Sequence, residues 1–343
     1  MNKLHNVSKH HIWTAIVLAA LALLPFAISG YQTSLATQML IFAALAMSID
    51  ILAGYAGRTP LGHGAIFGVA TYVLLYYVTT AGGSLLGGIA LGILAAVGTA
   101  VVFGALAIRT SGVYFLLLTL ALGMIVWGVS LRWTSVTGGE NGIRGTVKPE
   151  WLASHVNLYY FTLAITSLMA LAMWRFVNSP FGLTLKGIRE SETRMKALGY
   201  NVPLHVFIGF VVSGFFAGMA GILYAFYNSF VSPSTVELRQ SVAGLLMAIV
   251  GGIGTLFGSL IGSIVIITLE NLVSLYTERW SMVLGLMFIF TMIFAPEGLV
   301  GKARQLMARR QARLSAAATL SAAATQGAAT SPSTAGRDKG GGH

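Results

Sequence analysis

The side chains best suited to chemistry in this sequence are gathered in one short run. Six charged residues lie within 186–196, although the whole 343-residue chain has only 21 basic and 10 acidic residues. Glu190 precedes Arg194 by four residues and Glu192 precedes Lys196 likewise, and at this spacing opposite charges meet on one helix face. Paired charges of this kind favour a solvated helix surface over a reactive centre.

The ends of this helix are also marked in the sequence. Ser179 can cap the N-terminus, Pro180 suits the first turn, and Gly199 suits the C-terminus. The residues that share the apolar face are Leu185, Ile188, Met195 and Leu198. Glu192 falls at the edge of that face, where a helix lying on lipid would carry an apolar residue. We therefore predict a short amphipathic helix at about 180–199 that fits a groove on another protein better than lipid headgroups.

Two acidic residues, Asp50 and Glu270, fall inside predicted membrane spans, where ionisable groups are costly and often functional. Asp50 could bind a substrate ammonium group or a proton, pair with Arg58, or replace a structural asparagine. Glu270 lies toward the outer part of its span, where a capping or hydrogen-bonded structural role is the alternative to a functional one. His63, within L-G-H-G, is interpreted as a hydrogen-bonded packing residue rather than a ligand.

Several kinds of reactive site are missing from the sequence. There is no cysteine, so disulfides and thiolate metal sites are excluded. No G-x-x-x-x-G-K-[ST] loop for ATP phosphates occurs, and neither H-E-x-x-H nor G-x-S-x-G is present. We therefore predict that the chain is not an enzyme and holds no metal, ATP or other cofactor itself.

Composition indicates the environment that surrounds these residues. Hydrophobic residues make up 56% of the chain and charged residues only 9%, against about one-quarter charged in soluble domains. Polar side chains are too few to cover a folded surface in water, so we expect an all-α integral membrane protein with about ten transmembrane helices. The segments that are apolar and long enough to cross a bilayer are 12–29, 34–57, 61–80, 84–107, 112–131, 156–177, 203–227, 240–257, 259–277 and 281–296.

Glycine interrupts this pattern in two places. The glycine-rich stretches 54–68 and 251–262 are predicted to contain broken or re-entrant backbone, which at membrane depth needs protein or a water-filled cavity around it. Glycines also recur every fourth residue at Gly214 and Gly218, and at Gly254, Gly258 and Gly262. Such faces let helices approach closely, either within this chain or against another membrane subunit.

Basic residues predict the orientation, because they are enriched on the cytoplasmic side. With the N-terminus in the cytoplasm, the basic residues left outside are Arg132, Arg144, Lys148, Arg239 and Arg279, and the other 16 lie inside. Topology and anionic lipid thus explain the net charge of +11 without nucleic acid. We predict a transmembrane domain at 1–301 and, at 302–343, a cytoplasmic tail that is first basic and then disordered.

Four motifs resemble the membrane-spanning permeases of branched-chain amino-acid type ABC importers, in particular the larger of the two permeases, over roughly 37–301. They are the charged segment, G-Y-A-G-R-T-P-L-G-H-G from residue 54, G-G-I-G-T-L-F-G-S-L-I-G at 251–262 and F-A-P-E-G-L-V-G at 294–301. In the charged segment the matching residues are Ser179, Pro180, Phe181, Gly182, Leu185, Ile188, Arg189, Glu190, Glu192, Ala197, Leu198 and Gly199. In the second motif they are Gly54, Tyr55, Ala56, Gly57, Leu61, Gly62 and His63.

The resemblance implies a subunit of an ATP-driven importer in the bacterial inner membrane, with both termini in the cytoplasm. The implied partners are a second homologous permease, two ATP-binding cassette subunits that carry ATP and Mg²⁺, and a periplasmic or extracellular substrate-binding protein. The implied substrates are branched-chain or related neutral amino acids. The charged helix would be the coupling helix that docks on an ATPase subunit, through Leu185, Ile188, Arg189, Glu190, Glu192, Ala197, Leu198 and Gly199.

The resemblance also implies two further sites. A translocation path would include Asp50, Gly54, Gly57, Gly62, His63, Gly251, Gly252 and Gly254. The binding protein would dock on the longest external loop, at Gly138, Gly139, Asn141 and Gly142.

The sequence departs from the family pattern in three places. Pro60 stands where serine is usual, Asp50 where asparagine is common, and Met195-Lys196 where small residues occur. The first two leave the substrate open, and permeases for urea and short amides belong to the same family. An ion-coupled secondary transporter of small amino acids or amides, which would use Asp50 and Glu270 as ion sites, is the alternative from another class.

Overall fold

The computed structural model describes residues 21–26 and 28–276, with 282–283, 285–286, 289, 298 and 301. Most of the predicted spans 12–29 and 281–296, and all of the tail 302–343, lie outside the described residues. The number of ten spans therefore stays a prediction. The described elements are almost all helical, and five of the helices are long and apolar enough to cross a membrane.

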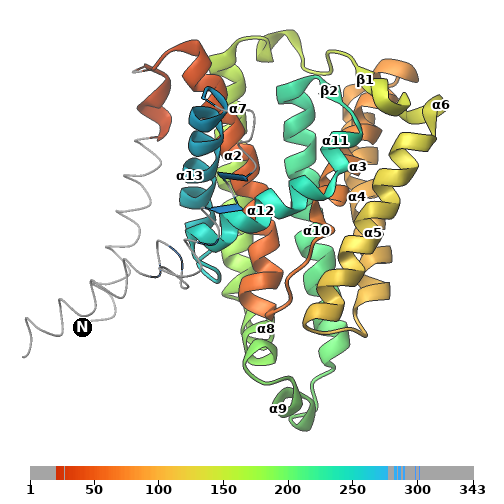
Figure 1. Ribbon diagram of the computed structural model, residues 1–343, viewed down its shortest axis with the longest axis vertical. Coiled ribbons are helices and arrows are strands. Elements are labelled where there is room, and N and C mark those ends of the chain that lie inside the picture. Colours follow the sequence, from red (N-terminus) through yellow and green to blue (C-terminus); the bar gives the residue numbers. More distant parts are fainter. Residues whose placement is uncertain are drawn as a thin grey trace, which may run out of the picture.

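A buried helix forms the centre of the bundle. α2 (Gly30–Asp50) continues into a π-helical turn, η1 (Ile51–Ala56), and 94% of its most apolar stretch is buried. Because the helix is apolar on all sides, it is stable only when other helices surround it. The helices packed against it are α7 (His155–Val177), α10 (Val202–Asn228), α12 (Leu238–Gly251) and α13 (Gly258–Ser274) (Figure 1).

Two other long helices lie at the outside of the bundle. α4 (Leu85–Ala107) is 28% buried and α5 (Val113–Arg132) is 17% buried over their most apolar stretches. Their exposed side chains include Leu94, Leu117 and Ile125. An outer surface of this composition requires lipid around it, which agrees with the predicted membrane protein.

The glycine faces are used for packing inside this chain. A side-chain carbon at Gly214 or Gly218 of α10 would collide with Ala100 or Ala96 of α4. Likewise, a side-chain carbon at Gly262 of α13 would collide with the Met247 carbonyl of α12. Gly214, Gly218 and Gly262 therefore bring neighbouring helices of one chain together, as the packing interpretation predicted. Gly254 does not share this helix face, because it lies in a non-helical stretch before α13 and has φ 81°.

Both glycine-rich stretches contain a break in the helical backbone. Residues 57–62 are not helical, and α3 begins only after them (His63–Leu75, followed by a π-helical turn, η2, Tyr76–Thr80). A second break, at 252–257, separates α12 from α13. The prediction of one span at 240–257 was wrong, because the 14 residues of α12 reach only about 21 Å, short of a hydrocarbon core of about 30 Å.

The two ends of the bundle carry different structures (Figure 1). One end, called here the α8–α9 end, carries α8 (Pro180–Glu190) and α9 (Glu192–Ala197). The opposite, β1–β2 end carries the antiparallel strands β1 (Ile143–Arg144) and β2 (Phe230–Val231), a small exception to the all-α prediction. The short helices around these strands are α6 (Thr134–Thr137), η3 (Gly139–Asn141), η4 (Glu150–Leu152) and α11 (Pro233–Val236).

Candidate functional site

The charged segment folds as two short helices rather than the single helix that was predicted. Ser191 adopts an extended backbone, with φ −162° and ψ 103°, and its side chain accepts a hydrogen bond from the Arg194 N–H at 3.2 Å. Ser191 thus ends α8 and caps α9. At the outer ends the predictions hold, since Ser179 accepts a bond from the Gly182 N–H and Gly199 has φ 86°.

The break at Ser191 divides the predicted apolar face. Leu185 and Ile188 are buried against this chain, with 0% and 4% exposed, and Met195 is 9% exposed. Leu198 does not join them, because it is 66% exposed. Leu185 and Ile188 therefore hold α8 on the bundle, with their side chains covered by this chain.

Arg189 extends from α8 to the first helix break. Its Nη1 donates a hydrogen bond to the carbonyl of Gly54, in η1. A carbon on Gly57 would lie 3.0 Å from Arg189 Cγ, and a carbon on Gly254 would lie 3.1 Å from Arg189 Nη1. One arginine of the charged segment thus contacts both glycine-rich breaks.

Asp50 joins the two breaks to each other. It is fully buried at the end of α2, and its Oδ1 accepts a hydrogen bond from the Gly254 N–H at 2.7 Å. Its Oδ2 has no hydrogen-bond partner among the described residues. Gly54 allows this approach, since a side-chain carbon there would collide with Asp50 and with the Gly254 backbone. Asp50 therefore has a structural bond in this conformation.

Arg58 ties the first break to α9. Its Nη2 lies 2.8 Å from Glu192 Oε2, its Nη1 donates to the Thr110 carbonyl, and its side chain is 6% exposed. Glu192 also pairs with Lys196 at 3.1 Å, as the spacing predicted. The suggested pairing of Asp50 with Arg58 was wrong, because Arg58 pairs with Glu192, whose side chain stays 35% exposed.

The other predicted pair does not form. Glu190 ends α8 and Arg194 lies in α9, so the turn at Ser191 removes the helical spacing that would have brought them together. Among the ion pairs of the described residues, neither of these side chains takes part.

We call Asp50, Gly54, Arg58, Arg189 and Gly254 the junction. It brings together motifs that are far apart in sequence: the charged segment, the break at 57–62 and the break at 252–257. Gly298, from the fourth motif, lies against the second break, because a side-chain carbon on it would collide with Gly252. The junction therefore holds charged side chains and backbone groups of three separate segments in contact with one another.

His63 and Gly62 lie beside the junction in a different setting. The His63 ring is fully buried, and its Nε2 lies 2.6 Å from the Ser213 hydroxyl of α10. A carbon on Gly62 would lie 3.0 Å from the Phe103 ring. This agrees with the interpretation of His63 as a hydrogen-bonded packing residue. Both residues are covered by protein, as are Gly251 and Gly252 in the second break.

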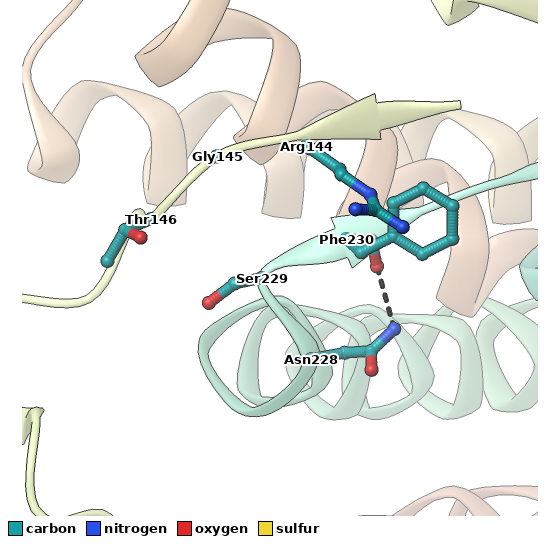
Figure 2. Close-up of a pocket in the computed structure, with 6 residues that line it drawn as sticks. All are labelled: Arg144, Gly145, Thr146, Asn228, Ser229 and Phe230. Atoms are coloured by element: carbon teal, nitrogen blue, oxygen red, sulfur yellow. Dashed lines mark hydrogen bonds between the residues drawn. The ribbon is translucent and has the colours of Figure 1, made fainter. Parts of the chain in front are cut away.

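The predicted docking loop lies at the β1–β2 end. Gly138, Gly139 and Gly142 all have positive φ values there, whereas Asn141 is exposed within the turn η3. Figure 2 shows the adjoining hollow, of about 610 Å³, in which the Arg144 guanidinium lies over the Phe230 ring at 5.1 Å. The Asn228 amide, which also lines the hollow, donates to the Phe230 carbonyl at 2.9 Å.

Sequence reasoning missed the roles of Arg58 and Lys186. Arg58 was considered only as a possible partner of Asp50, and Lys186, which lies 5.1 Å from the Tyr55 ring, was counted only as a surface charge. A basic residue inside a glycine-rich break and an acid at the edge of an apolar face were both visible in the sequence. Reading those two anomalies together would have suggested the Arg58–Glu192 pair.

Comparisons with known proteins agree with these features. The family model for the permease component of branched-chain amino acid transport systems matches residues 31–292. The high-affinity branched-chain amino acid transport system permease protein LivM of Salmonella typhimurium is 24% identical over 323 residues, which cover 86% of this chain and 76% of LivM.

Two further relatives are more distant. LivH, a permease protein of the same kind of system in Escherichia coli K12, is 22% identical over 76% of this chain and 91% of its own length. The autoinducer 2 import system permease protein LsrC of Salmonella typhi is 26% identical over 54% of each chain. The predicted resemblance to the larger permease is confirmed by the LivM match.

Proposed function

The chain belongs to the family of permease components of branched-chain amino acid transport systems, and from this premise we propose that it is the translocating subunit of an ATP-driven amino-acid importer. As a transport subunit it is not an enzyme, so ATP and Mg²⁺ would bind to partner subunits. The observation that carries the proposal is the junction, because there an exposed helical segment is tied directly to breaks inside the membrane bundle.

The junction supports a mechanical role for α8 and α9. A rigid movement of α8 would pull on the Gly54 carbonyl through Arg189, and a movement of α9 would pull on residue 58 through Glu192. Asp50 would carry the displacement to Gly254. Since packed elements move as units and breaks absorb changes in φ and ψ, the two breaks are the places where the path would open and close.

The surface available to an ATPase subunit is the outward side of α8–α9. Leu198 is 66% exposed there, and Glu190, Arg194, Ala197 and Gly199 are exposed around it. We propose that this mixed apolar and charged surface docks on an ATP-binding cassette subunit, and that the α8–α9 end therefore faces the cytoplasm. Leu185 and Ile188, which are buried, would contribute to coupling by packing, and Arg189 and Glu192 would contribute through their contacts with Gly54 and Arg58.

The remaining partners follow from the family and the opposite end of the bundle. LivM and LivH both match this chain, which supports a second, homologous permease in the assembly. The β1–β2 end would then face the periplasm or the exterior, and its loop with Gly138, Gly139, Asn141 and Gly142 would receive the substrate-binding protein. The inner membrane and cytoplasmic termini are part of the same proposal.

The relatives favour this proposal over the alternatives. Their names describe transport-system permeases, which gives no support to an ion-coupled secondary transporter. Among substrates, branched-chain or related neutral amino acids agree with the family description better than urea or short amides.

The coupling proposal is tested by reversing one exposed charge. Glu190→Lys, studied in proteoliposomes with the second permease, the ATPase subunits and the binding protein, should abolish leucine uptake while the complex still assembles and hydrolyses ATP. Uptake is measured with ATP enclosed on the cytoplasmic face and ionophores present to collapse membrane potential and proton gradient.

A matched control places the same change at the other end. Glu150, in η4, is also exposed, and Glu150→Lys should leave uptake and ATP hydrolysis unchanged. Normal uptake in Glu190→Lys would disprove docking at α8–α9. Uptake by the unaltered complex that stops when the ion gradients collapse, despite the ATP, would support the secondary transporter instead.

A further inference from the structure

A cavity distant from the junction contains a pair of opposite charges. It lies between α2, α10, α12 and α13 and has a volume of about 360 Å³. Arg239 at the start of α12 and Glu270 near the end of α13 line it, with Arg239 Nη2 3.1 Å from Glu270 Oε1. Glu270 therefore has a hydrogen-bond partner on another helix, in agreement with the hydrogen-bonded role considered for it from the sequence.

The charges remain accessible although they lie among apolar helices. The side chains of Arg239 and Glu270 are 55% and 30% exposed. Ion pairs between helices of a membrane bundle are costly, and they mark a bundle interior or water-filled cavity that a substrate or ion uses. Both charged side chains therefore remain partly open to the cavity.

The rest of the lining divides into a polar and an apolar part. Gln38 and Gln240 add amide groups near the charges, whereas Phe42, Leu246 and Ile267 form an apolar wall. A small number of polar groups within an apolar lining is the usual composition of a small-molecule site. The volume is near the lower end of such sites, at about 300 Å³ and above, so the cavity suits a ligand of few atoms.

We propose that this cavity binds one free α-amino acid as a zwitterion. Its carboxylate would bind the Arg239 guanidinium, for which two parallel N–H···O bonds are the favoured geometry. Its ammonium group would donate to the Glu270 carboxylate, and an aliphatic side chain would lie against Phe42 and Leu246. The inference rests on the proposed amino-acid importer and adds a substrate site to it.

Charge balance favours a zwitterion over other solutes. The Arg239–Glu270 pair is neutral as a whole, and a zwitterion that inserts between its members replaces one ion pair by two without adding net charge. An anion or a cation would add net charge to the cavity and compete with one member of the pair, at a cost inside the bundle. Urea or a short amide carries no charge for either residue to recognise.

The site is separate from the junction. Gln38 precedes Asp50 by twelve positions in α2, which corresponds to about 18 Å along the helix axis. A solute in the cavity therefore does not touch the breaks. The solute would stay bound on the β1–β2 side of the two breaks until movement at the junction opens the path.

The absence of cysteine from the chain gives a direct test of occupancy. Ala243 lines the cavity one helical turn after Arg239, and Ala243→Cys in the assembled complex without its binding protein can be labelled by a small charged thiol reagent. L-Leucine should slow this labelling at least fivefold. Thr146→Cys, at an exposed position of the β1–β2 end, is the control whose labelling leucine should leave unchanged.

Two comparisons separate recognition of both charges from simple blocking. In the Arg239→Gln/Glu270→Gln background, leucine should no longer protect Ala243→Cys from the thiol reagent. Glutamine removes both charges but remains a polar side chain at each position. Leucinamide, which lacks the carboxylate, and 4-methylpentanoate, which lacks the ammonium group, should protect poorly in the unaltered background. The second comparison needs no change to the ion pair, so a folding defect cannot explain it.

The outcomes distinguish this inference from the proposed function. A complex that imports leucine with ATP but shows no protection of Ala243→Cys, or equal protection by leucinamide, overturns the zwitterion site and leaves the importer standing. Protection that persists in the double-glutamine background also overturns it. A complete complex that imports no amino acid would overturn both.

Discussion

The chain places an arginine against a glutamate in two regions, and the two pairs are built differently. At the junction, Arg58 is 6% exposed, Glu192 is 35% exposed, and their atoms are 2.8 Å apart. In the cavity, Arg239 is 55% exposed, Glu270 is 30% exposed, and the distance is 3.1 Å. The two pairs therefore differ little in their N–O distance, but they differ strongly in how far the arginine is buried.

Burial determines what each pair can do. The Arg58 guanidinium also bonds the Thr110 carbonyl and lies 5.9 Å from the Phe115 ring, so it cannot leave Glu192 without losing several contacts at once. These contacts hold the pair in one arrangement, as the proposed coupling role requires. An accessible pair beside a cavity can exchange its partner for a solute, because water and solute reach both charges.

The largest expected effect comes from removing the buried arginine. Arg58→Met would leave the Thr110 carbonyl and part of the Glu192 charge without a partner, and should lower the free energy of unfolding by about 2–3 kcal/mol, below the range for a fully buried pair because Glu192 is partly solvated. Unfolding of the purified protein in a mixed detergent titration measures the change.

A double variant serves as the control for that prediction. Arg58→Met/Glu192→Gln should recover part of the loss, since no unpaired charge remains, and the difference gives the coupling between the two residues. If Arg58→Met lowers the free energy of unfolding by less than about 0.5 kcal/mol, the Arg58–Glu192 pair contributes no more to stability than an exposed pair such as Arg239–Glu270.

The next effect concerns the close approach at the junction. Gly54→Ala would place a carbon against Asp50 Oδ1 and the Gly254 backbone, so it should destabilise the protein by about 1–3 kcal/mol and reduce uptake. Gly98→Ala in α4 is the matched control, because a carbon there meets nothing within 4 Å; it should be neutral or stabilise the helix by up to about 1 kcal/mol. Equal stability in the two variants would show that the close approach of Gly54 to Asp50 and Gly254 does not hold the breaks together.

A smaller effect is expected from the charge of Asp50. Asp50→Asn keeps an oxygen that can accept the Gly254 N–H bond, so ATP-driven uptake should stay within about twofold of the unaltered complex. Asp50→Leu removes that acceptor and should reduce uptake far more. Uptake that is lost equally in both variants would mean that the negative charge itself acts during transport, as the secondary transporter requires.

The sequence predicted best those features that depend on local chemistry. The caps at Ser179 and Gly199, the Glu192–Lys196 spacing and the two glycine-rich breaks each depend on residues close together in the chain. The breaks could be located because apolar periodicity stops where glycine accumulates. Most boundaries of the long apolar helices followed for the same reason, since a bilayer imposes a minimum length on them.

The sequence could not predict which distant residues meet. Pairing Arg58 with Glu192, or Arg239 with Glu270, needs the relative positions of helices, and composition does not contain them. The Ser191 turn was missed because the apolar pattern continues through it, and Leu198 was consequently placed on the wrong face. The coupling and docking roles remain proposals, since they depend on partner proteins.

The smallest effect on stability is expected in the cavity. Exposed ion pairs contribute about 0–1 kcal/mol, because solvent already stabilises both charges. Arg239→Gln/Glu270→Gln should therefore change the free energy of unfolding by less than about 1 kcal/mol, in the same detergent titration that reveals the loss in Arg58→Met. Salt should change the stability of the unaltered cavity pair slightly through screening and leave the buried pair nearly unaffected.

This last prediction decides whether burial is the right criterion. If the double-glutamine variant loses as much stability as Arg58→Met, the cavity pair is a structural link, and a zwitterion would have to disrupt the fold in order to bind. If stability is kept while leucine no longer protects Ala243→Cys, the pair serves the solute rather than the fold. The same two side-chain types would then perform opposite tasks, transmitting movement where they are covered and recognising a substrate where they are open.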